Sequence, residues 1–248
     1  MGATYPTKLQ LAFRSGDRCA FPGCDKALVV QGASSGMAVV GVAAHIAGEN
    51  EGAARYDGSM TDTERDGYSN LIYLCGTHHT EIDGLPSEYT VERLHAMKEE
   101  HENRVREGVA DALSTVGFAE LEEATDWILQ IPPGGLGGDF LVVPPDEKIR
   151  KNELSTRERA VITMGLSVAR EVRAYIQSMA QTDSEFAERL KAGFLEEYFR
   201  LRREGLSGDE LFDLMCRFAQ RGFRDHSRRS AGIAVLVYLF EACEVFER

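Results

Sequence analysis

The chain has 248 residues, 43% of them hydrophobic and 27% charged, which is typical of a folded globular protein and excludes a disordered or fibrous one. Its formal net charge of -12, from 28 Lys and Arg against 40 Asp and Glu, excludes a protein that coats nucleic acid through bulk positive charge. Binding of nucleic acid would need a local basic patch, bound cations or a partner protein. The length predicts two domains.

The beginning of the chain lacks the unbroken apolar stretch of a secretory signal. The longest apolar run, residues 231–240, is far shorter than the roughly 20 residues that span a bilayer. We therefore expect a cytoplasmic protein without membrane contact. In that reducing compartment the five cysteines indicate metal ligands or core residues rather than disulfides. Cys216 and Cys243 lie in amphipathic helical patterns, and we interpret both as small buried hydrophobic residues.

Two pairs of potential metal ligands occur in the first third of the chain. Four residues separate Cys19 from Cys24, and two separate Cys75 from His78. Both spacings suit one tetrahedral zinc ion, and four protein ligands leave no open position, as in structural sites. The alternative is a set of unconnected thiols and an imidazole. Because two compatible pairs occur and no other cysteine lies in the first 200 residues, we favour a structural Zn²⁺ that staples two distant loops.

Three further polar residues lie on predicted elements between and after these pairs. Residues 37–46 are rich in β-branched and small apolar residues and predict a strand that ends near His45. Asn70 opens a second apolar run, NLIYLC, which leads into the second ligand pair. His79 begins a short helical segment in which Asp83 lies four residues later, hence on the same face. The pattern predicts a strand, strand and helix that bring these groups together.

The order His45, Asn70, His79, flanked by the zinc-ligand pairs, resembles the HNH, or ββα-metal, endonuclease family. The segment LCGTHH is similar to that family's usual LCxxCH, with His78 in place of the second cysteine. The resemblance covers about residues 15 to 105. It implies a zinc-stapled ββα nuclease unit with helical extensions. Together with the helical patterns that follow this unit, we expect an α+β fold whose C-terminal domain is all-α. It also implies cleavage of DNA, which we expect to be double-stranded.

The resemblance implies a role for each motif residue. His45 would be the general base that takes a proton from the attacking water. His79 would bind a single catalytic cation, Mg²⁺ or Mn²⁺, with Asp83 as its second ligand. Asn70 would either orient His45 or reach the cation.

The loop between the motif residues leaves two questions open. Many family members place Asp or His directly before the general base as a further cation ligand, and here that residue is Ala44. Either water or a nearby carboxylate, Glu49 or Asp57, would take its place. Arg55 and Arg65 are the only basic residues of this loop. They are candidates to contact DNA phosphates, and solvated loop charges are the alternative.

Helices dominate the predicted remainder of the chain. Residues 89–113 predict a long helix that Thr90 can cap, with His95 and His101 as packing or solvent residues, and residues 118–130 predict a further helix. Prolines and glycines in residues 131–145 predict a linker with one short strand at 140–143. The predicted domains are a nuclease domain at 1–115, a helix and linker at 116–145, and a helical interaction or regulatory domain at 146–248.

The last domain predicts a bundle of about four helices. A capping-box pattern, Ser or Thr followed three residues later by Glu, opens three of its apolar-periodic stretches. These pairs are Ser155/Glu158, Thr182/Glu185 and Ser207/Glu210. The final helix, predicted at 229–247, contains AGIAVLVYLF, which is apolar on every face. Such a helix is either buried at the centre of the bundle or covered by a partner.

The ending RRSAGIAVLVYLFEACEVFER is similar to C-terminal domains of effectors in bacterial three-component systems that contain an ABC-type ATPase. That resemblance implies antiphage defence, with a region that binds a regulatory protein or forms a homo-oligomer and holds the nuclease inactive. Two other functions remain open. One is a non-catalytic zinc module that binds nucleic acid or protein, and the other is an interaction protein whose helical half is the functional part.

Overall fold

The computed structural model describes residues 2–31, 37–131, 144–220, 226–242 and 246. The chain forms two compact units, Met1–Arg106 (unit 1) and Glu107–Arg248 (unit 2), and the division falls within helix α4 (Val91–Leu113). The protein is mainly helical with small antiparallel sheets, an α+β arrangement. The strand predicted at 140–143 and most of the predicted linker lie outside the described residues.

Unit 1 contains two short antiparallel strand pairs among its described residues. They are β1 (Val29–Gln31) with β2 (Met37–Val39), and β3 (Val42–His45) with β4 (Leu71–Leu74). The single strand predicted at 37–46 was therefore wrong, because β2 and β3 belong to different sheets. The chain changes sheets at Gly41, where an added Cβ would lie 2.3 Å from the ring of Tyr73. Only a glycine lets the backbone pass so close to that ring.

The helices of unit 1 follow local signals in the sequence. They are α1 (Tyr5–Arg14), α2 (Asp62–Arg65), the 3₁₀-helix η1 (Tyr68–Asn70), α3 (Gly76–Gly84) and most of α4. Thr61 and Glu64 form a reciprocal capping box at the start of α2. The hydroxyl of Thr90 accepts a hydrogen bond from the backbone N–H of Arg93 at 3.3 Å, which confirms the predicted cap of α4.

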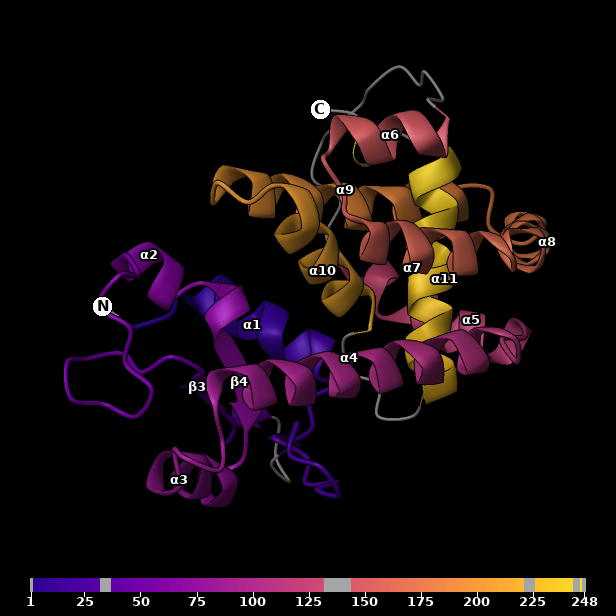
Figure 1. The fold of residues 1–248 in the computed structure, drawn as a ribbon. Helices are drawn as coiled ribbons and strands as arrows, with labels where there is room; N and C mark the ends of the chain where they lie inside the picture. Colours follow the sequence, from indigo (N-terminus) through magenta and orange to yellow (C-terminus); the bar gives the residue numbers. More distant parts are fainter. Residues whose placement is uncertain (1, 32–36, 132–143, 221–225, 243–245, 247–248) are drawn as a thin grey trace. The chain divides into compact units, whose positions relative to one another are not determined.

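Strands β3 and β4 and helix α3 form the frame that carries the candidate site (Figure 1). In the antiparallel register His45 pairs with Leu71, so the end of β3 lies beside the start of β4. Helix α3 packs against both strands and begins directly after β4, with Cys75 as its N-cap residue. The core beneath this frame is apolar and fully buried, and includes Leu11, Ile46, Leu71, Ile72, Ile82 and Leu94.

Unit 2 is built around its last helix. Its described elements are the end of α4, α5 (Phe118–Asp126), η2 (Ile128–Gln130), α6 (Pro145–Lys151), α7 (Thr156–Leu166), α8 (Ala169–Ala180), α9 (Phe186–Arg203), α10 (Gly208–Ala219) and α11 (His226–Ala242). Helix α11 packs against α5, α7, α8 and α10, and its side chains from Ser230 to Val237 are buried. Of the two predicted environments for this apolar helix, the centre of the bundle is therefore the one observed.

The number and starts of the helices differ in part from prediction. Six described helices, α6 to α11, occupy the region where about four were predicted. Ser155 caps α7 as predicted, and Ser207 precedes α10 but makes no capping hydrogen bond through its side chain. The predicted start at Thr182 was wrong, because Asp183 closes a separate turn and α9 begins only at Phe186. Among the described residues, no helix combines the length and apolar character needed to cross a bilayer.

Candidate functional site

The structure brings the two predicted ligand pairs together. The ligand atoms of Cys19, Cys24, Cys75 and His78 all lie within 4.8 Å of one another. Nδ1 of His78 lies 3.4 Å from Sγ of Cys19 and 3.4 Å from Sγ of Cys75. In a tetrahedral zinc site the usual bond lengths place a sulfur and a nitrogen ligand about 3.6 Å apart. The cluster could hold a metal ion, and its three sulfurs and one nitrogen are compatible with structural zinc.

The loop that carries the first ligand pair is fixed by its own turn. Gly23 adopts a left-handed conformation, φ +74°, and the N–H of Cys24 donates to the carbonyl of Phe21 at 3.0 Å. The Phe21 ring stacks on the imidazole of His78, with ring centres 3.8 Å apart and an interplanar angle of 10°. This stacking holds the plane of the imidazole, and with it the direction of its ligand nitrogen.

The two buried thiols of the cluster differ in acidity. Burial raises the pKa of Cys19 to about 12. Burial also acts to raise the pKa of Cys75, but hydrogen bonds from the backbone N–H of His78, the thiol of Cys19 and the backbone N–H of Thr77 outweigh it and lower that pKa. Because a thiolate is the form that binds a metal ion, binding at Cys19 displaces a proton and weakens as the pH falls.

His45 lies at the end of β3, as predicted, and has a carboxylate partner that the sequence analysis did not identify. Nε2 of His45 lies 3.1 Å from Oδ1 of Asp66, and the side chains are 16% and 17% exposed. Asp66 follows the last residue of α2. The capping box at Thr61 indicates where α2 begins, but no local pattern indicates that Asp66 meets His45.

The buried side chain of Asn70 holds the chain that leaves β3. Its Oδ1 accepts from the N–H of Ala47, and its Nδ2 donates to the carbonyls of Ala47 and Arg65, each at 2.9 Å. The backbone carbonyl of Asn70 also accepts from the N–H of Ile46 at 2.8 Å. Both hydrogens of the amide are thus used, and the backbone next to His45 is held from two sides.

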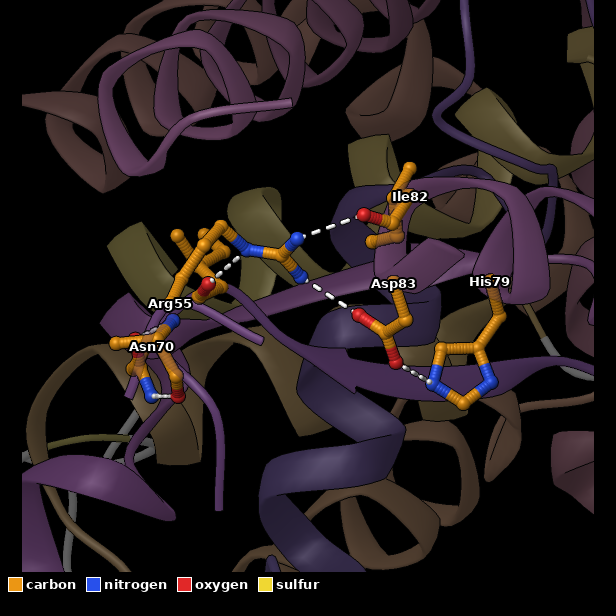
Figure 2. A network of polar contacts seen from close by, with 7 residues as sticks. Arg55, Asn70, His79, Ile82 and Asp83 are labelled. Atoms are coloured by element: carbon orange, nitrogen blue, oxygen red, sulfur yellow. Dashed lines mark hydrogen bonds and ion pairs between the residues drawn. The ribbon is translucent and has the colours of Figure 1, made fainter. Parts of the chain in front are cut away.

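His79 and Asp83 lie one helical turn apart on α3 and contact each other, with Nε2 of His79 3.2 Å from Oδ2 of Asp83 (Figure 2). The other carboxylate oxygen of Asp83 accepts from Nη2 of Arg55 at 2.7 Å. The same guanidinium donates to the carbonyls of Ile82 and Ile46, both at 2.7 Å. Arg55 is only 5% exposed along its side chain and joins the end of β3 to the end of α3.

The second loop arginine is also enclosed by the protein. Arg65 is buried and donates to the carbonyls of Gly48, Asp57 and Met60 at 2.9 to 3.0 Å. Its guanidinium lies 4.5 Å from the centre of the Tyr56 ring. The hydrogen bonds of both arginines are therefore directed at protein carbonyls and, for Arg55, a carboxylate. Their contact with DNA phosphates stays a prediction.

The two alternative carboxylates for the cation, those of Glu49 and Asp57, lie on the exposed loop after β3. Ala44 is buried and offers no ligand atom. Glu49 is exposed, and the carboxylate of Asp57 accepts from the N–H and hydroxyl of Ser59 at 2.9 and 2.7 Å. These contacts lower the pKa of Asp57. The role of either carboxylate as a ligand of the cation stays a prediction.

Helices α1 and α4 support the motif from behind through Tyr68, two residues before Asn70. The Tyr68 ring has the Arg14 guanidinium 4.5 Å and the Lys98 ammonium 3.5 Å from its centre, and its hydroxyl donates to Glu102.

Of the two histidines predicted to be packing or solvent residues, His95 is exposed. His101 is buried and donates through Nε2 to the carbonyl of Ser15 at 3.0 Å.

Within the described part of the chain, one group of three or more Cys, His, Asp or Glu residues has the geometry to hold a metal ion, and it is the Cys19, Cys24, Cys75 and His78 cluster. No family model and no curated protein matches the chain. A functional conclusion therefore depends on the geometry of these residues and their chemistry.

Proposed function

We propose that unit 1 is a metal-dependent endonuclease of the HNH, or ββα-metal, kind that hydrolyses phosphodiester bonds of DNA. The observation that carries the proposal is the position of the Arg55 guanidinium. It binds the carbonyl of Ile46, the residue after His45, and also the carboxylate partner of His79. The backbone next to the His45 imidazole and the carboxylate that contacts the His79 imidazole thus both bind the Arg55 guanidinium. This supports a common site for the two histidines.

In the proposed reaction His45 accepts a proton from a water molecule. The water oxygen bonds to phosphorus, the bond from phosphorus to the 3′ oxygen breaks, and the leaving oxygen takes a proton from solvent. An imidazole suits this step because it can be neutral and basic at pH 7. Asn70 holds the backbone beside His45, so it supports the position of the base rather than touching the phosphate.

His79 and Asp83 are the residues that would hold a divalent cation, Mg²⁺ or Mn²⁺. A bound cation of this kind neutralises the charge that grows on the phosphoryl group and on the leaving oxygen. One imidazole and one carboxylate fit such an ion, because Mg²⁺ keeps several water ligands and shares the phosphate oxygens of its substrate. Arg55 orients the Asp83 carboxylate by occupying Oδ1.

We infer that Zn²⁺ fills the cysteine and histidine cluster and has a structural role. Cys75 is the N-cap of α3, and His78 precedes His79 directly. An ion held there fixes the first turn of α3, from which His79 projects. Zinc at this cluster therefore determines the position of a proposed catalytic residue without contacting the substrate.

The test compares plasmid cleavage by the wild type and by His45→Ala, with added Mg²⁺ or Mn²⁺ and with the zinc content measured in both. We expect the substitution to lower the cleavage rate by about 100-fold or more, the usual effect of losing a general base. Zinc content should stay unchanged, and the variant should remain folded. His95→Ala, the same change at an exposed histidine of α4, is the matched control. Equal cleavage by the wild type and His45→Ala would refute the assignment of the base.

A non-catalytic zinc module is the second candidate, and one observation favours it. The two basic residues of the loop donate to protein groups, and the chain is acidic overall. Such a unit would bind a protein more readily than a phosphate backbone. A wild type that contains zinc but cleaves neither DNA nor RNA with any divalent cation would favour this candidate.

We propose further that unit 2 regulates the nuclease, as an effector of bacterial antiphage defence held by a partner protein or by a second copy. The support is the similarity of its last helix to such effectors. Because α11 is buried within unit 2, the contact surface would belong to other helices. Analytical ultracentrifugation of the full chain tests the homo-oligomer, and a monomer at all concentrations would exclude it.

A further inference from the structure

We propose that Asp66 is the positioning residue for His45, and that it holds the hydrogen of the neutral imidazole on Nε2 so that Nδ1 is the basic nitrogen. The inference deepens the proposed function and rests on it only where His45 is named as the base. Neither the motif nor its spacing indicated Asp66. The inference comes from the contact between Nε2 of His45 and Oδ1 of Asp66, 3.1 Å apart.

Both partners of this contact are held by the fold before any substrate binds. His45 is fixed by its pairing with Leu71 and by the hydrogen bonds of Asn70 to the chain that follows. Asp66 is fixed because its N–H donates to the carbonyl of Asp62 at 2.9 Å, at the end of a helix that a capping box begins. Both side chains are more than four-fifths buried, so water competes weakly for the contact.

The protonation pattern follows from the acceptor chemistry of a carboxylate. An ionised carboxylate only accepts hydrogen bonds, so the contact requires a hydrogen on Nε2 of His45. A neutral imidazole carries one hydrogen, which leaves the lone pair on Nδ1. During the reaction the water proton moves to Nδ1, and the resulting imidazolium lies beside the negative charge of Asp66. The carboxylate thus selects the tautomer first and then stabilises the protonated ring.

The test uses Asp66→Asn in the full chain, because an amide of the same shape can donate to Nε2 as well as accept from it. Asp62→Asn is the matched control, since it makes the same change at an exposed residue of the same helix. Histidine is labelled with ¹⁵N, and nitrogen shifts are recorded at pH 8.5 in zinc-loaded protein without added Mg²⁺ or Mn²⁺. The His45→Ala variant assigns the signals of His45 among the six histidines.

In the wild type we expect the neutral His45 ring to carry its hydrogen on Nε2. In Asp66→Asn we expect a measurable share of the ring to carry it on Nδ1 and the cleavage rate to fall by about tenfold or more. Asp62→Asn should match the wild type in both measurements. A hydrogen on Nδ1 in the wild type, or an unchanged tautomer in Asp66→Asn, would overturn the inference.

The two proposals can fail separately. If His45→Ala abolishes cleavage while Asp66→Asn keeps both the tautomer and the rate, the nuclease stands and the role of Asp66 is wrong. If neither the wild type nor any variant cleaves nucleic acid but the tautomer of His45 depends on Asp66, the role of Asp66 stands and the proposed nuclease activity is wrong. Weaker Mn²⁺ binding by Asp66→Asn with an unchanged tautomer would make Asp66 a cation ligand, and that also overturns the inference.

Discussion

Both units of this protein have an apolar core, but unit 1 also contains a cluster that could hold a metal ion. Unit 2 surrounds an apolar helix, α11, whose side chains from Ser230 to Val237 are buried. Unit 1 has short strands and long loops, and it buries polar side chains such as those of Arg65, Asn70 and His101. Unit 2 also buries charged side chains, for example Lys148, whose ammonium donates to the carbonyl of Phe240 at 2.6 Å. Its centre is nevertheless apolar.

This difference between the units shows where side chains must be held at defined distances. Apolar burial is strong but not directional, so it stabilises a bundle without fixing one atom against another. Hydrogen bonds to specific carbonyls, and metal ligation, hold side chains at defined distances. Unit 1 has such hydrogen bonds at the end of β3 and at the end of α3, and it has a cluster that could hold a metal ion at the start of α3. Its stability should therefore depend on individual polar groups and on a metal ion.

The largest effect should come from loss of the metal cluster. Cys75→Ser, or a zinc chelator, should unfold much of unit 1, because structural zinc in small domains binds with roughly 10 kcal/mol or more that also stabilises the fold. Hydrogen exchange followed by mass spectrometry should show fast exchange in α3 and unchanged protection in α11. Cys216→Ala is the control, since Cys216 is a buried cysteine of unit 2 outside the cluster. Equal loss of protection in both units would contradict the comparison.

The next effect concerns the Asn70 amide. Asn70→Ala leaves both backbone groups of Ala47 and the carbonyl of Arg65 without their partner, and we expect it to lower the stability of unit 1 by about 3 kcal/mol. Local exchange rates of β3 and β4 measure the loss. Asn50→Ala, at an exposed asparagine of the adjacent loop, should have little effect. A similar loss for both variants would show that the amide contacts are not decisive.

A steric change tests unit 2 in the same way. A Cβ added to Gly232 would lie 2.0 Å from the carbonyl oxygen of Ala219, so α10 and α11 would have to separate. We expect Gly232→Ala to destabilise unit 2 by about 2 to 3 kcal/mol while zinc binding is retained. Fluorescence of Trp127, which packs on Phe218, reports the unfolding of this unit. Gly108→Ala, where a Cβ meets no atom within 4 Å, should be neutral or stabilising.

The smallest effect is a pH dependence in unit 1. Burial lowers the pKa of His101, so the unfolded chain binds a proton at this residue before the folded protein does. The neutral His101 side chain makes its full contribution to the free energy of unfolding above the ordinary histidine pKa of about 6.5. This contribution is lost as the pH falls from there through the pKa of the folded state, by at most about 1.4 kcal/mol per pH unit. His101→Gln should flatten this slope in zinc-loaded protein. A steeper pH dependence of stability in the variant would contradict the assigned direction of the pKa shift of His101.

Local patterns predicted part of the fold and of the site. The two ligand pairs, the caps at Thr61 and Thr90 and the position of His45 each depend on a few neighbouring residues, and the structure contains them. The break between β2 and β3 was missed because Gly41, where the chain changes sheets, packs against the ring of Tyr73, which is distant in sequence. The late start of α9 was missed because the side chain of Asp183 competes with the predicted cap.

The roles of the polar residues were decided by tertiary structure. Arg55 was identified as a loop cation, yet its partners lie directly after β3 and on α3, up to 28 residues away in the chain. Asp66 lies 21 residues after His45, and its carboxylate meets the imidazole only in the folded protein. Spacing within a turn determines which residues can share one ion. Which carboxylate meets an imidazole depends on loop paths that no short-range pattern encodes, because their contacts form only after the chain has folded.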